Sequence, residues 1–456
     1  MMSLAILAEA LKAPHVGKDA VFTGVCHDTR TLQRGDLYVA IKGEHFDGHS
    51  FLAEAITAGA VGALLARDME TSLPYVRVPN TRLGLGNLGA FWRGQFKIPV
   101  IAVTGSNGKT TVKEMIGAML GETGPGCVTR GNLNNDIGVP LTLSRLRAGD
   151  KYAVIEMGMN HPGEIEYLSR LTSPTIALIT NAAEAHLAGV GTVEDVARAK
   201  GEIFAGLSED GTAVLNADDP HFPLWKTFTG LKKCLTFGLD HKADVSGAYE
   251  LTDTGSVIQL KTITHGDIDM RIPVLGRHNV MNALAATAAA LAAGASLENV
   301  KTGLEKLKTV SGRMEVKQGI SGARIIDDTY NANPASVAAG LQVLKEFSGE
   351  RVLVLGDMGE LGAAAADIHF RVGELASRIG VQRLFAIGEL SRVAVGAFGK
   401  GARHFESHVA LIEALQDCLH AEMTVLVKGS RLMRMERIVA GITKKSPVKT
   451  ETGRSR

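Results

Sequence analysis

Residues 100–111 read VIAVTGSNGKTT. The four apolar residues at the start predict a buried strand, and the spacing of Val112, Met115 and Ile116 predicts a helix that follows it. Glycines between the two elements let backbone N–H groups approach an anion, and the helix N-terminus adds partial positive charge. We therefore predict a phosphate-binding loop made of Gly105, Ser106, Asn107, Gly108, Lys109, Thr110 and Thr111.

The loop departs from the common G-x-x-x-x-G-K-T pattern, because Val103 occupies the position of its first glycine. In that pattern Lys109 reaches the β- and γ-phosphates of a nucleotide, and the Thr110 hydroxyl holds Mg²⁺. The alternative is a glycine-rich turn between a strand and a helix, with a surface lysine. The apolar strand before the turn and the helical pattern after it favour the phosphate loop.

Composition excludes several classes of protein. The net charge of +1 gives no bulk attraction to nucleic acid or to an anionic membrane. The four cysteines lie far apart without a C-x-x-C pair, which is typical of free thiols in a reducing cytoplasm. Glu9 interrupts the short apolar run at the N-terminus, and no apolar stretch reaches membrane-spanning length. We expect a cytoplasmic protein without nucleic-acid partners or membrane insertion.

The length of 456 residues predicts about three domains. We expect an α/β fold with a small α/β domain at residues 1–80. Residues 81–310 are expected to form a central P-loop-type domain around a doubly wound, mostly parallel sheet. Residues 234–273 lose the helical pattern and predict short antiparallel strands. Residues 311–456 predict a Rossmann-like α/β domain with strands at 323–326, 351–355, 383–387 and 424–427.

Polar residues follow several predicted strands of the central domain. Glu156 ends the strand at 152–155, a position that suits Mg²⁺, although a capping or salt-bridged glutamate has the same pattern. His186 follows a further strand, and Lys200 lies on a predicted helix, where the residues alone favour a solvated lysine. The loop that holds Asn132, Asn134 and Asn135 can be an ordinary asparagine-rich turn, or it can bind a polyhydroxyl or phosphate ligand.

The outer domains also carry polar loops after strands. In the first domain these residues are Asp28, Thr29, Arg30, Lys42, Gly43, Asp47, Gly48 and His49, and spacing alone favours ordinary turn chemistry. The third domain carries Asp, Asn, Arg and Lys in its loops but no second phosphate loop. We therefore expect the third domain to close over a ligand that the central domain holds.

Taken together, these motifs resemble the Mur ligase family over nearly the whole chain, the basic tail excepted. Members of this family use a shortened ATP loop, which accounts for Val103. The resemblance implies that Lys109, Glu156, His186 and Lys200 carry the chemistry. It also implies ATP and two Mg²⁺ ions as cofactors, with metal ligands Thr110, Glu156, His186 and Lys200, the last as a carbamate (N6-carboxylysine).

The same resemblance assigns the nucleotide contacts outside the phosphate loop. They fall on the segment Gly276-Arg277-His278-Asn279, on the pair Gly312-Arg313 and on the loop at 327–334. The implied contacts are Asn279, Asn282, Arg313, Asp327, Tyr330 and Asn331.

Narrower segments resemble the branch of the family that adds D-alanyl-D-alanine to UDP-N-acetylmuramoyl-tripeptide through an acyl phosphate, making the pentapeptide precursor of peptidoglycan. The first-domain loops would bind the UDP-sugar, the loop at 131–140 would bind substrate, and Lys428, Ser430 and Arg431 would form a closing motif. The sister ligase that adds a diamino acid carries an Asp-Asn-Pro-Arg motif, which this sequence lacks.

We expect the protein to be a monomer.

Three alternatives remain open at this point. One is another ligase of the same type, including the diamino-acid-adding enzyme or one similar to folylpolyglutamate synthase. Another is a small-molecule kinase, which would need no amine. The third is a catalytically silent nucleotide-binding protein, which the presence of Lys109, Thr110, Glu156 and His186 disfavours.

Overall fold

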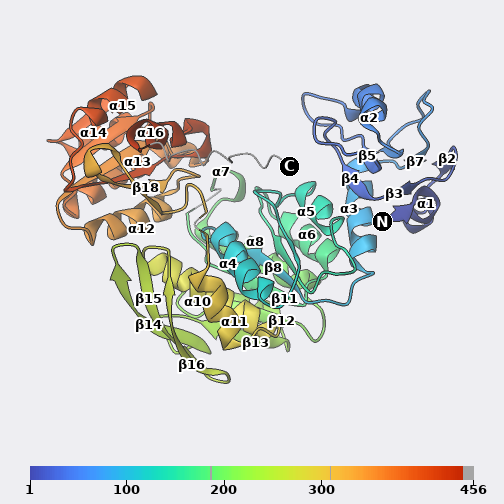
Figure 1. Cartoon of the computed structure of the whole chain (residues 1–456), viewed down its shortest axis with the longest axis horizontal. Helices are drawn as coiled ribbons and strands as arrows, with labels where there is room; N and C mark the ends of the chain where they lie inside the picture. Colours follow the sequence, from blue (N-terminus) through green and yellow to red (C-terminus); the bar gives the residue numbers. More distant parts are fainter. Residues whose placement is uncertain (185–186, 309, 445–456) are drawn as a thin grey trace, which may run out of the picture.

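The computed structural model describes residues 1–184, 187–308 and 310–444. These residues form three lobes that follow one another along the chain, coloured blue, green to yellow, and orange to red in Figure 1. Each lobe is built on its own mainly parallel sheet with helices against it, so the predicted α/β fold class is confirmed. Within the described residues, no helix is long and apolar enough to span a membrane.

The N-terminal lobe contains a five-stranded sheet in the order β2-β7-β6-β5-β4, in which only β2 and β7 are antiparallel. A short ribbon of β1 and β3 lies beside it. The chain passes from the ribbon to the sheet at Thr23, between β3 and β4. The elements are β1 (Met2–Ser3), α1 (Leu4–Leu11), β2 (His15–Val16), β3 (Val21–Phe22), β4 (Gly24–Cys26), β5 (Asp36–Val39), η1 (Gly48–Phe51), α2 (Leu52–Ala58), β6 (Gly62–Leu65) and β7 (Tyr75–Arg77).

Helix α3 (Thr81–Arg93) joins the first two lobes. Asn80 caps it by accepting from the backbone N–H groups of Arg82 and Leu83. Leu85 and Leu88 of α3 belong to the apolar core of the N-terminal lobe. The helix also packs against α5 (Gly138–Leu143) and α6 (Glu164–Thr172) of the central lobe, so one helix anchors both cores.

A nine-stranded sheet forms the central lobe, in the order β16-β15-β14-β13-β12-β11-β8-β10-β9. The run from β9 to β14 is parallel, and β14, β15 and β16 are antiparallel. The expectation for 234–273 is therefore wrong for β13, which pairs in parallel with β12. The strands are β8 (Val100–Thr104), β9 (Cys127–Val128), β10 (Ala153–Glu156), β11 (Ile176–Ile179), β12 (Thr212–Asn216), β13 (Lys233–Phe237), β14 (Val245–Thr252), β15 (Gly255–Thr262) and β16 (Gly266–Ile272).

Helices cover both faces of this central sheet. The side chains of β8 alternate between the faces, so Ile101 and Val103 enter one core while Val100 and Ala102 enter the other. The first core lies under α4 (Lys109–Gly121), α10 (Arg277–Ala292) and α11 (Leu297–Glu305). The second lies under α5, α6, α8 (Val193–Gly201), η2 (Glu202–Gly206) and α9 (Phe222–Thr229), and α7 (Leu187–Val190) precedes α8.

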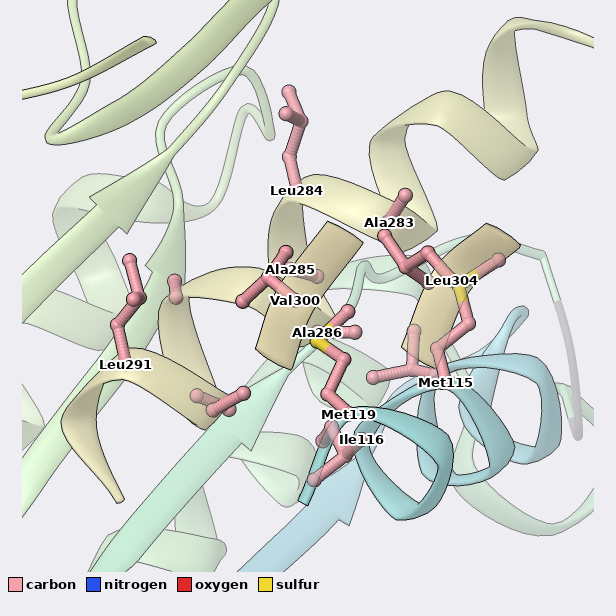
Figure 2. Close-up of a cluster of buried hydrophobic side chains, with 14 of the residues drawn as sticks. Met115, Ile116, Met119, Ala283, Leu284, Ala285, Ala286, Leu291, Val300 and Leu304 are labelled. Carbon is pink, nitrogen blue, oxygen red and sulfur yellow. The ribbon is translucent and has the colours of Figure 1, made fainter. Parts of the chain in front are cut away.

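Close packing on the first face fixes α4, the helix that begins at the phosphate loop. Figure 2 shows the side chains of α4 against the small side chains of α10 and the apolar side chains of α11. The alanines of α10 allow the two helices to approach closely. The residues in contact across these helices are Met115, Ile116, Met119, Ala283, Ala286, Val300 and Leu304.

The C-terminal lobe has a six-stranded sheet in the order β17-β18-β22-β19-β20-β21, with only β17 antiparallel. The four expected strands correspond to β18 (Arg324–Asp328), β19 (Glu350–Gly356), β20 (Arg383–Ile387) and β22 (Met423–Lys428). The sequence interpretation missed the edge strands β17 (Glu315–Gln318) and β21 (Ala402–Phe405), which are half-exposed and lack an apolar run. The helices are η3 (Ile320–Gly322), α12 (Pro334–Lys345), η4 (Gly362–Ala364), α13 (Ala365–Arg378), α14 (Ser391–Phe398), α15 (His408–Gln416), η5 (Arg431–Met433) and α16 (Glu436–Ile442).

Candidate active site

The turn between β8 and α4 has backbone angles that only glycine adopts readily. Gly105 has φ +149° and Gly108 has φ +82°. A Cβ atom at Gly105 would collide with Thr180 Oγ1, and one at Gly108 would collide with Asn282 Oδ1. The turn therefore brings the backbone of the loop against β11 on one side and α10 on the other.

Side chains that follow β11 hold the loop in place. The Ser106 backbone N–H donates to Asn181 O at 2.9 Å, and the Asn107 N–H donates to Asn181 Oδ1 at 3.0 Å. The Thr180 hydroxyl donates to Asn107 O at 2.6 Å. The sequence interpretation did not single out Thr180 and Asn181, although their position directly after a buried strand beside β8 was a signal for them.

Lys109 is the first residue of α4 and folds back over the loop. Its ammonium donates to Gly105 O at 2.6 Å and to Ser106 O at 3.4 Å. Burial lowers the pKa of Lys109, and the negative charge of Glu156 acts in the opposite direction. Thr110 and Thr111 follow in the first turn of the same helix. The loop, the lysine and the helix N-terminus thus lie together in one compact unit with the features that suit an anion.

Glu156 ends β10, the strand next to β8, and is buried. Asn134 Nδ2 donates to Glu156 Oε1 at 2.8 Å, so the structure brings one of the predicted loop asparagines to this carboxylate. In the part of the chain that the structure describes, Glu156 Oε2 has no hydrogen-bond partner. A buried carboxylate oxygen with free lone pairs suits a hard cation such as Mg²⁺.

Lys200 lies on α8 and is fully buried. The expectation of a solvated helix lysine, drawn from the residues alone, is therefore wrong. Burial, reinforced by the charge of Lys109, lowers the pKa of Lys200 well below its ordinary value. Among the described residues its Nζ finds no hydrogen-bond partner. A lowered pKa favours the neutral amine, which is the form that reacts with carbon dioxide to give a carbamate.

His186, the remaining predicted metal ligand, lies outside the described residues. Within the described ranges, no three His, Cys, Asp or Glu side chains gather into a ready-made cation site. Mg²⁺ commonly uses one or two carboxylates together with substrate phosphates. The buried oxygen of Glu156 that lacks a hydrogen-bond partner among the described residues fits that kind of site, whereas Lys200 fits it only as a carbamate.

The start of α10 lies next to the phosphate loop. Asn282 lies against Gly108 and donates from Nδ2 to Asn279 Oδ1 at 3.1 Å. Asn279 in turn donates to Leu275 O at 2.8 Å. Both side chains are buried. The structure thus brings Asn282 directly to the loop and uses Asn279 to orient it.

The C-terminal lobe faces the same loop through the segment after β18. Asn333 Nδ2 donates to Asn107 Oδ1 at 2.8 Å, a bond that joins this lobe to the phosphate loop. Asn333 also caps α12 by accepting from the Ser336 N–H. Asn333 was not among the predicted site residues. Its position before Pro334 at the start of a helix was a sequence signal for a capping residue.

Predicted nucleotide residues surround this junction. The Arg313 guanidinium lies 4.1 Å from the centre of the Tyr330 ring. Asp327 accepts from Lys317 at 2.5 Å and from the Thr329 hydroxyl at 2.7 Å. Asn331 accepts at Oδ1 from the Ala332 N–H at 2.9 Å.

The predicted closing motif follows β22. Lys428 is buried and paired with Asp328 at 2.6 Å, and it also donates to Asn331 O at 2.9 Å. Burial lowers the pKa of Lys428, while Asp328 opposes that shift. Ser430 is buried and its N–H donates to Asp357 O, whereas Arg431 is exposed, with its guanidinium 5.9 Å from the centre of the Tyr330 ring. Lys428 therefore fixes the loop at 327–334 from within.

Residues predicted to bind the UDP-sugar form two networks in the N-terminal lobe. Asp28 pairs with Arg30 at 2.6 Å, and that pairing lowers the pKa of Asp28 to about 2. Asp47 accepts from the His49 N–H and ring at 3.0 and 2.6 Å, which lowers the pKa of Asp47 to about 2. The His49 Nε2 accepts from the Ala66 N–H at 2.9 Å, so the ring links Asp47 to the end of β6.

The remaining predicted substrate residues differ in exposure. Gly48 is buried and accepts from the Tyr38 hydroxyl at 2.8 Å, Thr29 is half-buried, and Lys42 and Gly43 are exposed. In the central lobe, Asn132 is exposed, and Asn135 accepts at Oδ1 from the Gly138 N–H at 2.9 Å. Their described hydrogen bonds run within their own lobes, so the structure does not bring the N-terminal set to the phosphate loop.

A cleft of about 420 Å³ opens between the central and C-terminal lobes beside this junction. Ala183, which exchanges hydrogen bonds with Ser106, lines one side, and Pro334, next to Asn333, lines the other. The cleft therefore lies next to the turn between β8 and α4, in a position of the kind that small-molecule sites commonly occupy.

Comparison with known proteins yields matches along the whole chain. Three family models match in chain order: "Mur ligase family, catalytic domain" at residues 21–84, "Mur ligase middle domain" at 103–290, and "Mur ligase, glutamate ligase domain" at 312–431. The UDP-N-acetylmuramoyl-tripeptide–D-alanyl-D-alanine ligase of Escherichia coli (strain K12) is 43% identical over 97% of this chain and 98% of its own length.

Solved structures agree with this result. A crystal structure of MurF from Acinetobacter baumannii matches with a TM-score of 0.90 and 36% identity over 96% of this chain and 98% of that chain. MurF ligase from Thermotoga maritima in complex with ADP matches with a TM-score of 0.84 and 27% identity, covering 93% of this chain and 98% of that chain. The chain therefore belongs to the Mur ligase family.

Proposed function

We propose that this protein is the ATP-dependent ligase that joins D-alanyl-D-alanine to UDP-N-acetylmuramoyl-tripeptide, giving the pentapeptide precursor of peptidoglycan. The observation that carries this conclusion is the 43% identity, over 97% of the chain, to a ligase of that name. The geometry supports it, because the turn between β8 and α4 lies next to the strand that ends in the buried Glu156, and Ala183, which contacts the turn through Ser106, lines a cleft between two lobes.

The reaction joins a carboxylate to an amine, which requires activation. The terminal carboxylate of the tripeptide attacks the γ-phosphorus of ATP, so an acyl phosphate forms and ADP leaves. The amine of D-alanyl-D-alanine then attacks the acyl carbon, loses a proton and expels inorganic phosphate as the amide forms. The protein contributes positioning and charge neutralisation. Lys109 is central, since its ammonium can exchange the carbonyls of Gly105 and Ser106 for phosphate oxygens.

We propose that two Mg²⁺ ions act with ATP. The ligands would be Thr110 and Glu156 for one ion, and His186 with a carbamate on Lys200 for the other. When bound, Mg²⁺ would offset the negative charge of the phosphates. The unpartnered Glu156 Oε2 supports the first assignment. The lowered pKa of Lys200 supports the second, because only a neutral amine adds to carbon dioxide, releasing a proton and leaving an anionic oxygen ligand.

The remaining site residues are assigned in the same way. In the nucleotide site, Asn279, Asn282, Arg313, Asp327, Tyr330 and Asn331 would contact ATP together with the phosphate loop. Residues 1–80 would bind the UDP-sugar, residues 81–310 would bind ATP and the acyl phosphate, and residues 311–456 would close over the nucleotide and the dipeptide. The UDP-sugar and peptide contacts would come from Asp28, Thr29, Arg30, Lys42, Gly43, Asp47, Gly48, His49, Asn132, Asn134, Asn135, Lys428, Ser430 and Arg431. We also propose that the protein acts as a cytoplasmic monomer.

The test is phosphate release from ATP and UDP-N-acetylmuramoyl-tripeptide with a panel of amines. We expect release with D-alanyl-D-alanine and none with a free diamino acid or without amine. Preference for the diamino acid would move the assignment to the sister ligase. Phosphoryl transfer that needs no amine would instead indicate a kinase.

A further inference from the structure

A second lysine of α4, one helical turn after Lys109, has no part in the chemistry described above. Lys113 is fully buried. Its ammonium donates to Thr129 O at 2.8 Å and to Gly131 O at 3.3 Å, and lies 2.9 Å from Glu114 Oε1. The ammonium thus has two hydrogen bonds to backbone carbonyls and one ion pair. A buried cation held by several partners has a fixed position.

One of the two carbonyls that Lys113 binds, that of Gly131, begins a loop, residues 131–135, which we call the asparagine loop, and the other, that of Thr129, lies two residues before it. Gly131 opens this loop, and its Asn134 reaches Glu156 Oε1 at 2.8 Å. Asn134 O also accepts from the Gly158 N–H at 2.8 Å. The asparagine loop is therefore attached to α4 at one end and to the end of β10 at the other.

Lys113 also faces the carboxylate directly. Its Nζ lies 3.8 Å from Glu156 Oε2, the oxygen without a hydrogen-bond partner among the described residues. The same ammonium thus touches the helix of the phosphate loop, the asparagine loop and the carboxylate at the end of β10. No other contact described here joins all three.

We propose that Lys113 is a positioning residue that sets the distance between the ATP site and the muramoyl-peptide site by holding the asparagine loop against α4. This inference rests on the proposed function for the identity of the peptide substrate. Lys113 touches neither substrate. It acts through Asn134 and Glu156, so its removal moves the peptide-binding loop while the phosphate loop keeps its anchors at Thr180 and Asn181.

The test compares Lys113→Met with a matched control, Arg93→Met. Arg93 is also buried and donates to three backbone carbonyls, those of Thr172, Phe96 and Ser173, but these lie away from the site. Both variants lose bonds from a buried cation to carbonyls, so both should unfold at lower temperature. Only Lys113→Met should raise the KM for UDP-N-acetylmuramoyl-tripeptide, by roughly tenfold or more, with the KM for ATP changed less than about twofold.

A measurement without substrates tests the role of Lys113 independently of the proposed function. Hydrogen exchange of the amides at residues 131–137 should become faster in Lys113→Met and stay unchanged in Arg93→Met. Lys113→Gln, which keeps one donor, is a milder variant and should give the same pattern at smaller amplitude. If the wild-type protein did not ligate D-alanyl-D-alanine, the proposed function would be wrong. The hydrogen-exchange rates of residues 131–137 would still show whether Lys113 holds the asparagine loop in place.

A double variant tests whether Lys113 acts through the loop. Lys113→Met combined with Asn134→Ala should raise the KM for the tripeptide no further than the larger single change. Additive effects, equal KM changes for ATP and tripeptide, or unchanged exchange at residues 131–137 would each overturn the proposal.

Discussion

At the scale of single residues, burial decides which lysines can do chemistry. Lys200 looks like any helix lysine in the sequence, but the structure buries it without a described hydrogen-bond partner. Lys113 is equally buried and has three partners. The missing partner favours the neutral amine of the first lysine, whereas the partners of the second hold its charged end in place. Sequence spacing alone could not separate the two, since burial arises from tertiary packing.

Replacement of Lys200 tests its proposed role as a carbamate. Lys200→Ala should lower kcat by about 100-fold, because an anionic metal ligand is lost. Added acetate or formate should restore part of the activity by supplying a carboxylate to the vacated space. Lys109→Ala serves as the control, since a lost cation cannot be replaced by an added anion. Loss of activity in Lys200→Ala that short carboxylates leave unchanged would favour a purely packing role.

At the scale of elements, the strand–loop–helix unit of β8 and α4 is the part most clearly encoded in the sequence. Its apolar run, its glycines and its helical spacing are local signals, and the structure has the strand and helix where they predict them. The edge strands β17 and β21 carry no such signal, because they are short and half-exposed. Their pairing depends on neighbours distant in the sequence.

The glycine at the start of α4 gives a sharp test of the loop. Gly108→Ala places a Cβ against Asn282 Oδ1, so ATP binding should be lost. Gly294→Ala is the matched control, because Gly294 also has positive φ (+94°) but has open space around it. Both substitutions should cost about 1 kcal/mol of stability from backbone strain. Nucleotide binding, measured by calorimetry, should fail only for Gly108→Ala; intact binding there would contradict the assigned loop geometry.

At the scale of the whole molecule, the central and C-terminal lobes meet at the phosphate loop, and α3 joins the N-terminal lobe to the central lobe. The order of lobes and the parallel sheets follow from repeated strand–helix alternation, so they could be predicted from the sequence. The contact of Asn333 with Asn107 could not, because 226 residues separate the two side chains. The partners of Thr180, Asn181 and Asn134 could not be predicted either, because these contacts depend on which strands are neighbours in the sheet.

The bond between Asn333 and Asn107 predicts how the lobes communicate. Asn333→Ser keeps an oxygen that caps α12 but is too short to reach Asn107. We expect the KM for ATP to rise roughly three- to tenfold, because the free energy of one hydrogen bond is lost. The melting temperature should stay unchanged. Steady-state kinetics and calorimetry check the two parts. An unchanged KM would show that the C-terminal lobe does not stabilise the loop through this bond.

The most direct test of the central claim, ATP-driven amide formation, follows one oxygen atom. UDP-N-acetylmuramoyl-tripeptide labelled with ¹⁸O in its terminal carboxylate is incubated with ATP and D-alanyl-D-alanine. The reaction described here transfers one labelled oxygen to each phosphate released, as the acyl phosphate breaks on amide formation. Mass spectrometry should find that label in inorganic phosphate in step with the pentapeptide product. Unlabelled phosphate, released without the pentapeptide, would contradict the account.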